Sequence, residues 1–378
     1  MIGGGQGAFI GAVHRLAAAL DGHYELVAGA FSSRPETSRA TGQHLGLNPE
    51  RVYGSYQELI EQEKARPAAE RVQVISIVTP NYLHFAPAKM ALENGFDVVL
   101  DKPLTFSLAE AKELAAVVQA TGRRLCLTHT YTGYPMVKEA RQRVAAGALG
   151  TIRKVYVEYP QGWLSTFAEG DADNKQAGWR TDPTRSGIAG AMGDIGTHAF
   201  NLLEYVTGLQ VEKLCADINT VVPGRQLDDD GAVLLRLSNG ASGVLVATQV
   251  AAGEENNLRL RVYGEIGGLD WQQADNNTLL LKHLDRPTEI LRTNAPYLSA
   301  LARHNTRVPP GHPEGYLEAF ANIYRNFALT LQAELTGQTP SPEALDYPGI
   351  EEGVRGMAFI ENVIASGRSD QKWTDLTV

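Results

Sequence analysis

The sequence has few cysteines and no long hydrophobic run. Cys126 and Cys215 are the only two cysteines in 378 residues, and both stand in apolar segments far apart in the chain. This spacing fits neither a disulfide framework nor a cysteine metal site, so we expect two buried thiols in a reducing cytoplasm. No apolar run approaches the roughly 18 residues of a membrane span, and the first residues lack the basic-then-apolar profile of a signal peptide. We therefore expect a cytoplasmic protein without a membrane partner.

Basic residues are outnumbered by acidic ones. The chain has 34 Lys and Arg against 43 Asp and Glu, a net charge of −9, and no dense basic stripe. An electrostatic footprint for nucleic acid or anionic lipid is therefore missing, which leaves small molecules as the expected partners. No His, Cys, Asp or Glu cluster has metal-ligand spacing, so we expect no metal.

The length and the 43% of hydrophobic residues suggest two cores rather than one. Strand-like and helix-like segments alternate in the first third, which is typical of a doubly wound parallel sheet. The expected strands are residues 24–31, 72–78, 97–102 and 123–129, and the expected helices are 10–20, 35–46, 56–64, 84–94 and 108–121. We therefore predict an α/β fold with an N-terminal Rossmann-like domain over residues 1–131.

Beyond residue 151 the chain becomes rich in β-segments, which predicts an α+β domain over residues 132–378 with an open, mainly antiparallel sheet. Asn239-Gly240 between two apolar segments is a strong hairpin signal. Helices are expected at 194–206, 316–336 and 350–366, and the C-terminal ones can pack back on the first domain. A cleft between the domains is the default active site. The apolar face of an open sheet is normally covered, so we expect a homodimer or homotetramer that associates through this sheet.

A glycine cluster opens the chain. Gly3, Gly5 and Ala8 match G-x-G-x-x-G/A, whose glycines allow a tight turn and a close approach to a pyrophosphate at a helix N-terminus. At the start of a Rossmann domain this motif predicts that the domain binds a dinucleotide. The predicted cofactor-binding residues here are Gly3, Gly5, Gln6, Gly7, Ala8 and Phe9. Only Met1 and Ile2 precede the turn, fewer than a central strand needs, which favours a start assigned or cut downstream of the true one.

Ser32, Ser33 and Arg34 follow the second expected strand, where NAD-binding proteins place an acid for the ribose 2′-hydroxyl. Without a carboxylate, these side chains can accommodate the 2′-phosphate of NADP. An exposed loop beside NAD held in another way is the equal alternative, so the cofactor is expected to be NAD or NADP, with a weak lean to NADP.

Polar residues also follow two later strands. Thr79, Pro80 and Asn81 come directly after one strand, and Asp101 and Lys102 end the next. Ligands bind at the carboxyl ends of strands in open α/β sheets, so these residues, together with His84, are predicted to contact the cofactor. A lysine before a proline is also a common solvated surface charge.

The segment GDIGTH places Asp194 and His198 four residues apart, on one face of an expected helix. An N-cap aspartate with a core histidine would explain the same pair. Gly190, Gly193 and Gly196 crowd this segment, which we take to leave open backbone space beside the two polar side chains.

These motifs together resemble the Gfo/Idh/MocA oxidoreductase family, the glucose-fructose oxidoreductase and inositol dehydrogenase group. The resemblance spans nearly the whole chain: the glycine turn, TPNYLH, DKP for the usual E-K-P, and GDIGTH for G-D-x-G-x-H. It implies Lys102 as the active-site lysine, His198 as the general acid/base and Asp194 as the carboxylate that holds the substrate. Asp101 replaces the family's Glu, and Asn201 stands where many relatives have Asp, which puts a substrate contact there in doubt.

The resemblance implies hydride transfer between NAD or NADP and a hydroxyl or keto carbon of a sugar, anhydrosugar or inositol-like polyol. A histidine that titrates near neutral pH suits removal of the hydroxyl proton, and a lysine cation stabilises the developing alkoxide. Two alternatives stay open: a sugar lyase or glycosidase that uses NAD catalytically, and a nucleotide-binding regulator without turnover.

Further substrate contacts are expected from an aromatic and basic loop and from one strand end. Trp163, Trp179 and Arg180 offer an aromatic face and hydrogen-bond donors for a sugar, although a surface loop with a packed Trp is equally consistent. Tyr131 ends the last Rossmann strand. His312 precedes a helix and serves either the substrate or the helix cap.

Overall fold

The computed structural model describes residues 1–171 and 173–378 and divides into two compact units. Unit 1 comprises residues 1–129 and 320–354, and unit 2 comprises residues 130–319 and 355–378. Unit 1 thus combines the N-terminal part of the chain with a segment from its C-terminal part.

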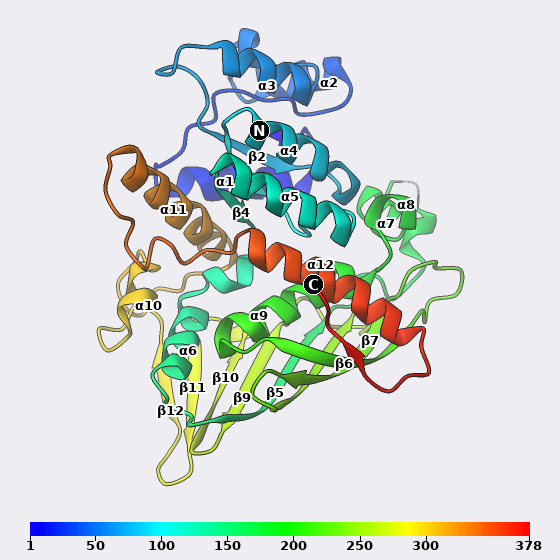
Figure 1. Ribbon diagram of the computed structural model, residues 1–378, viewed down its shortest axis with the longest axis vertical. Coiled ribbons are helices and arrows are strands. Elements are labelled where there is room, and N and C mark those ends of the chain that lie inside the picture. Colours follow the sequence, from blue (N-terminus) through cyan, green and yellow to red (C-terminus); the bar gives the residue numbers. More distant parts are fainter. Residues whose placement is uncertain (172) are drawn as a thin grey trace. The chain divides into compact units, whose positions relative to one another are not determined.

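Unit 1 is built on a parallel sheet in the order β1-β2-β3-β4. Its strands are β1 (Ile2–Gly3), β2 (Val74–Val78), β3 (Asp97–Leu100) and β4 (Leu125–Leu127). Its helices are α1 (Phe9–Leu20), α2 (Pro35–His44), α3 (Tyr56–Ala65), α4 (Phe85–Glu93) and α5 (Leu108–Thr121), with 3-10 turns η1 (Pro49–Arg51) and η2 (Asn81–Leu83) (Figure 1). This alternation confirms the predicted Rossmann-like fold.

Helix α5 illustrates how local sequence sets these boundaries. The Ser107 hydroxyl accepts a hydrogen bond from the backbone N–H of Glu110, and Gly122 ends the helix with a left-handed φ of 63°. Such caps satisfy backbone groups that the helix itself leaves unpaired.

The expected strand over residues 24–31 is not formed. Only isolated parallel bridges occur there, from Ala30 to Ile2 and from Gly29 to Val52. The physical reason is that β1 has two residues, so most of the segment has no strand opposite it to share hydrogen bonds. Met1, residues 23–28 and residues 69–74 instead line a groove of about 750 Å³.

Residues 320–335 belong to helix α11 (Tyr316–Leu335) and are held in unit 1 by long-range polar contacts. The Tyr324 hydroxyl lies 2.7 Å from His14 Nδ1 and 2.9 Å from Ser76 Oγ. The backbone N–H of Leu127 in β4 donates to Pro348 O at 2.8 Å. These contacts explain why the late segment is part of the Rossmann unit.

Unit 2 contains a nine-stranded sheet in the order β12-β11-β10-β9-β5-β8-β7-β6-β13. The strands are β5 (Ile152–Pro160), β6 (Val211–Asn219), β7 (Asp230–Leu237), β8 (Ser242–Thr248), β9 (Arg259–Gly264), β10 (Gly267–Gln272), β11 (Thr278–His283), β12 (Glu289–Arg292) and β13 (Thr374–Asp375). All pairs are antiparallel except β5 with β8. The Asn239-Gly240 hairpin is confirmed between β7 and β8, with Gly240 at a φ of 84°.

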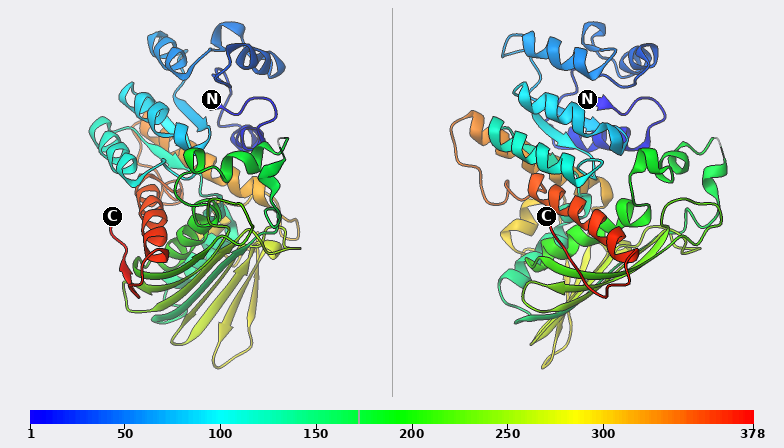
Figure 2. Two further views of the ribbon diagram at one scale, coloured as in Figure 1. Left: turned by 90° about the vertical axis from the view of Figure 1, so that its right-hand side faces the viewer. Right: turned by 45° about the vertical axis from the view of Figure 1, so that its right-hand side comes forward.

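Helices of unit 2 cover one face of this sheet, and α6 and α9 contact each other and its strands (Figure 2). The helical elements are α6 (Pro135–Ala145), α7 (Lys175–Arg180), α8 (Pro183–Ser186), the π-helical turn η5 (Met192–Gly196), α9 (Thr197–Thr207), α10 (Ala300–His304) and α12 (Ile350–Gly367), with 3-10 turns η3 (Thr130–Gly133), η4 (Ala168–Gly170) and η6 (Gln273–Asp275). On the other face, Leu234, Val244 and Tyr156 are aligned across β7, β8 and β5, and Leu234 is 46% exposed.

The two cysteines are unpaired, but only Cys126 is buried, and burial raises the pKa of its thiol. Cys215 is half-buried on β6, so the expectation of two buried thiols is wrong for the second.

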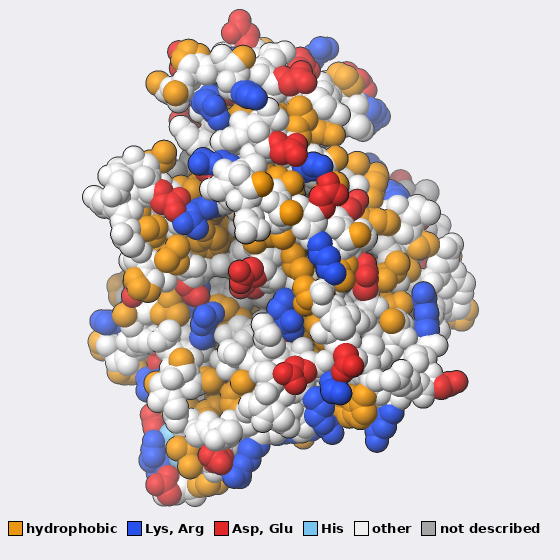
Figure 3. All heavy atoms as spheres, in the orientation of Figure 1, with side chains coloured by type: hydrophobic (Ala, Val, Ile, Leu, Met, Phe, Trp, Pro, Cys, Tyr) orange, Lys and Arg blue, Asp and Glu red, His pale blue; other side chains and the backbone are white. Residues whose placement is uncertain are grey.

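Lys and Arg side chains are interspersed with Asp and Glu on the face shown in Figure 3. No helix among the described residues combines the length and the apolarity needed to cross a bilayer.

Candidate active site

The carboxyl ends of the unit 1 strands lie at one edge of the sheet. Gly3 pairs with Val78, Ile77 with Leu100, and Leu100 with Leu127. The residues that follow β2, β3 and β4 therefore share this edge, where ligands of open α/β sheets bind.

The glycine turn after β1 has a backbone that other residues adopt only with strain. Gly3, Gly4 and Gly7 have φ values of 81°, 71° and 81°. A Cβ atom on Gly3 would lie 3.0 Å from Val78 O, and one on Gly11 would lie 2.3 Å from Gly4 Cα. The tight helix-to-turn contact thus falls at Gly11, a residue that the motif did not single out.

This turn fits the pyrophosphate of a dinucleotide. Nothing lies within 4 Å of a Cβ built on Gly7, and Phe9, the first residue of α1, is 62% exposed. The turn and the N-terminus of α1 therefore present open backbone to an anion. The N–H of Gln6 contacts Thr41 Oγ1 at 3.4 Å, and that of Ala8 donates to Gly5 O at 3.0 Å.

Ser32, Ser33 and Arg34 lie on the surface just after Phe31. A Cβ on Gly5 would be 2.9 Å from Phe31 O, so the glycine turn lies close to this segment. The N–H of Arg34 donates to Ser32 Oγ at 3.2 Å, and Ser33 and Arg34 are exposed.

Asp101 holds the backbone of Lys102. Asp101 Oδ1 accepts from the N–H of Lys102 at 3.0 Å and from Thr128 Oγ1 at 2.8 Å, and His14 Nε2 lies 3.7 Å away. Burial alone would raise the pKa of Asp101, but hydrogen bonding and the charges of His14 and Lys102 outweigh it and hold that pKa well below its usual range. The carboxylate is therefore ionised and orients the residue that carries the candidate lysine.

Two further histidines shape this edge. His84 is fully buried, with Nδ1 2.7 Å from Pro103 O and Nε2 2.8 Å from Thr79 O, and burial lowers the pKa of its ring. His84 therefore ties the turn after β2 to the loop after Lys102. Burial and the Lys102 charge lower the pKa of His129 to about 3, so its ring is neutral at pH 7.

In unit 2, Tyr131 and His198 meet edge to face, with ring centroids 4.9 Å apart. The hydroxyl of Tyr131 also forms a short hydrogen bond with that of Tyr159, which donates to Asn256 Oδ1 at 2.7 Å. The Asn256 amide returns a contact to the Tyr131 hydroxyl at 3.4 Å. Burial raises the pKa of Tyr131 and of Tyr159, so both phenols stay protonated and act as hydrogen-bond donors beside His198.

Asp194 is the centre of a second set of contacts. Gln249 donates to Asp194 Oδ2 at 2.9 Å, and Arg180 Nε lies 3.5 Å from the same oxygen. Arg180 also stacks on Trp179, with its guanidinium carbon 4.3 Å from the ring centroid, and lies 6.0 Å from that of Trp163. Aromatic faces, a guanidinium and a carboxylate thus gather in one place.

Gln161 joins these two sets. Its Oε1 accepts from Trp163 Nε1 at 3.0 Å and from Gln249 Nε2 at 3.3 Å, while its Nε2 donates to Asn256 Oδ1 at 2.6 Å. A continuous polar network therefore runs from Asp194 to the Tyr131 side of His198.

The structure brings together most of the expected substrate residues but not all. Tyr131, Trp163, Trp179, Arg180, Asp194 and His198 belong to this connected set. His312 lies elsewhere, exposed, with Nδ1 3.1 Å from Pro309 O in its own turn. Asn201 is buried within α9, as is His198.

The segment before His198 differs from the expected loop and helix. Met192–Gly196 forms a π-helical turn that runs directly into α9, a feature often found at functional sites. A Cβ on Gly190 would lie 2.1 Å from Asp228 O. Gly190 therefore permits close packing of two backbones rather than leaving open space.

Sequence reasoning missed Gln161, Gln249, Asn256 and Tyr159. A signal was available for two of them, because β5 and β8 are parallel neighbours whose last residues, Pro160 and Thr248, are paired. Gln161 and Gln249 follow these paired ends, as the rule for carboxyl ends of parallel strands would have placed them.

Comparisons with known proteins find relatives that match both units. Residues 1–129 match the model of the oxidoreductase family with an NAD-binding Rossmann fold, and residues 137–270 match the GFO/IDH/MocA C-terminal domain. The uncharacterized oxidoreductase YfiI of Bacillus subtilis is 32% identical, covering 99% of this chain and 95% of that protein. The levoglucosan dehydrogenase of Pseudarthrobacter phenanthrenivorans is 27% identical, covering 100% and 97%.

Among solved structures, an inositol dehydrogenase homolog from Azotobacter vinelandii in complex with NAD+ has a TM-score of 0.94 and 35% identity, covering 99% of this chain and 96% of that one. A complex of the homolog with NADH and myo-inositol has a TM-score of 0.90. The NAD-binding fold of unit 1 and the sheet domain of unit 2 are thus those of one enzyme family: the chain belongs to the GFO/IDH/MocA oxidoreductases.

Proposed function

We propose that this oxidoreductase acts on a hydroxyl or keto carbon of a cyclic polyol or sugar, with NAD or NADP as the hydride partner. The observation that carries the proposal is the network from Asp194 through Gln249 and Gln161 to Asn256, because its carboxylate and carboxamide groups match a ring that bears several hydroxyls. The names of two relatives, an inositol dehydrogenase homolog and a levoglucosan dehydrogenase, support this substrate class.

His198 acts as the acid/base in this proposal. It takes the proton of the reacting hydroxyl as the adjacent C–H bond breaks, and it returns a proton in the reverse direction. The Tyr131 ring restrains the imidazole of His198 through an edge-to-face contact, with the ring centroids 4.9 Å apart. The bound nicotinamide supplies the hydride acceptor or donor.

Lys102 stabilises the negative charge that develops on the reacting oxygen. Asp101 holds the backbone from which the Lys102 side chain projects. Asp194 positions the substrate by accepting a hydrogen bond from a second hydroxyl, and Trp163 offers an aromatic surface to the apolar face of the ring.

A substrate panel tests this proposal. Inositols, pyranoses and anhydrosugars are each incubated with NAD and then NADP, and reduced nicotinamide is followed by absorbance, because the segment 32–34 decides neither cofactor. We expect stoichiometric NADH or NADPH with at least one cyclic polyol or sugar. Turnover without accumulation of reduced cofactor would indicate a lyase or glycosidase instead, and cofactor binding without any turnover would indicate a regulator.

We also propose that the chain forms a homodimer or homotetramer through the open face of the unit 2 sheet. Tyr156, Leu234 and Ile290 are 36%, 46% and 60% exposed on strands of this sheet, and such apolar surface is normally covered. Light scattering is expected to give at least twice the chain mass of 40.9 kDa, and Leu234→Lys should shift it towards the monomer. A monomeric mass for the unaltered protein would contradict this proposal.

The unpaired thiols favour a reducing, cytoplasmic location.

A further inference from the structure

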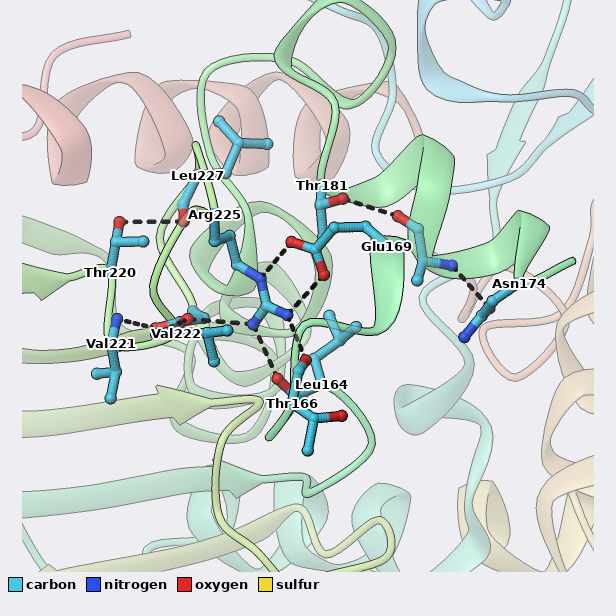
Figure 4. A network of polar contacts seen from close by, with 12 residues as sticks. Leu164, Thr166, Glu169, Asn174, Thr181, Thr220, Val221, Val222, Arg225 and Leu227 are labelled. Carbon is cyan, nitrogen blue, oxygen red and sulfur yellow. Dashed lines mark hydrogen bonds and ion pairs between the residues drawn. The ribbon is translucent and has the colours of Figure 1, made fainter. Parts of the chain in front are cut away.

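The buried Arg225 links the loop of Trp163 to Asp229. Asp229 in turn contacts Gln249, the residue that donates to Asp194. Arg225 lies between β6 and β7, and its side chain is 1% exposed. Its Nε and Nη2 donate to the two oxygens of Glu169 at 2.9 and 2.8 Å. Its remaining N–H groups donate to Leu164 O at 2.8 Å, Thr166 O at 2.9 Å and Asp229 Oδ2 at 3.1 Å (Figure 4). All five guanidinium donors therefore have a partner.

These contacts fix the course of residues 161–170. Four of the five bonds of Arg225 end on this loop, one each at Leu164 and Thr166 and two at Glu169, and the fork on Glu169 sets direction as well as distance. The same loop carries Trp163, whose indole donates to Gln161.

Asp228 holds the backbone of the segment that precedes Asp194. Asp228 accepts from the N–H of Gly190 at 2.6 Å and from that of Met192 at 2.8 Å, directly before Asp194. Each of its two oxygens accepts one of these bonds, which a carboxamide with a single oxygen could not do.

Asp229 holds the loop from which Arg225 projects. Its carboxylate accepts from the N–H groups of Val221 and Val222 at 2.7 and 2.9 Å. Its backbone carbonyl accepts from the N–H of Gln249 at 2.8 Å, and Gln249 is the residue that donates to Asp194.

We propose that Glu169, Arg225, Asp228 and Asp229, the Arg225 brace, position Trp163 relative to Asp194 and thereby determine affinity for the substrate. The brace touches neither reacting group, so its members are positioning residues. Directional bonds suit this task, since apolar packing of the same loops would not fix their register. The inference rests on the proposed function for its substrate but not for its effect on the loop.

The test replaces Arg225 with lysine, which keeps the positive charge but loses the five-donor fork. We expect KM for the substrate found in the panel to rise about tenfold or more, with a smaller change in kcat. The Kd for NADH should stay within about twofold, because unit 1 holds the glycine turn. Acrylamide should quench tryptophan fluorescence more strongly, and this increase should vanish in a Trp163→Phe background.

Arg259→Lys is the matched control. Arg259 also forms a fork on a carboxylate of unit 2, with Asp270 at 3.0 and 2.9 Å, but it lies outside the network of Asp194. The Arg259→Lys substitution should leave KM for the substrate and acrylamide quenching of tryptophan fluorescence unchanged. Equal rises of KM in the two variants, or no change in either readout for Arg225→Lys, would overturn the proposal.

Glu169→Gln covers the case in which Arg225→Lys does not fold. Glu169 is the more exposed partner of the fork, at 11% of its side chain, and glutamine keeps its shape while removing the charge. We expect KM and acrylamide quenching to rise less than in Arg225→Lys. If both stay at the values of the unaltered protein, the proposed role of the brace is overturned. If no polyol or sugar is oxidised by the unaltered protein, the proposed function fails, whereas the quenching comparison still decides whether the brace holds the loop.

Discussion

Replacing His198 with alanine is expected to lower kcat for substrate oxidation by about a hundredfold to ten-thousandfold, the usual contribution of a positioned acid/base. The remaining reaction has no positioned group to take the hydroxyl proton. Steady-state kinetics of both proteins at one pH would show the loss.

Binding separates this loss from a folding defect. The Kd for NADH, measured by fluorescence titration, should change by no more than about twofold, and His198→Asn should behave like the alanine variant while leaving a smaller gap beside Tyr131. His283→Ala is the matched control, because His283 pairs with Glu289 on the sheet at 2.8 Å and lies outside the network. A His198→Ala protein that keeps kcat within threefold of the unaltered enzyme would exclude the acid/base role.

Lys102→Met should lower kcat by about a hundredfold to a thousandfold, the scale measured when a preorganised group that stabilises an oxyanion is removed. Methionine keeps much of the length of the side chain but not its charge, so the loss reports electrostatics rather than packing. A substrate deuterated at the reacting carbon should show a larger isotope effect in the variant, because the chemical step becomes more strongly rate-limiting.

The same substitution at Lys112, an exposed residue of α5, provides the control for loss of one positive charge. It should leave kcat and the isotope effect unchanged. If Lys102→Met alters KM alone and leaves kcat intact, the lysine binds the ground state only, and the proposed stabilisation of the alkoxide is wrong.

Local sequence patterns were sufficient to predict most of unit 1, because each of its motifs spans only a few consecutive residues. Positive φ values at Gly3, Gly4 and Gly7 require glycine, and the apolar strands with the polar residues after them could be read in order along the chain. The rule that ligands bind at the carboxyl ends of strands also placed Asp101 and Lys102 at that edge of the sheet. The local pattern was wrong for residues 24–28, because a strand needs a neighbouring strand and β1 has only two residues.

The second unit depended far more on contacts between distant residues. Asp194 and His198 were visible in one motif, but Gln161, Gln249 and Asn256 come from separate segments and join only through the parallel pairing of β5 with β8 and the loop beyond it. No periodicity in a single segment encodes that pairing.

By itself the sequence determined the family, the glycine turn, the strand-end residues of unit 1 and the Asp194 and His198 pair, since each depends on residues close together in the chain. The tertiary structure alone decided that Tyr324 contacts His14, that Arg225 holds the loop of Trp163, and that a carboxamide network joins Asp194 to Tyr131. Those contacts join residues between 55 and 310 positions apart in the chain, whose meeting is set by sheet register and packing rather than by local conformational preference.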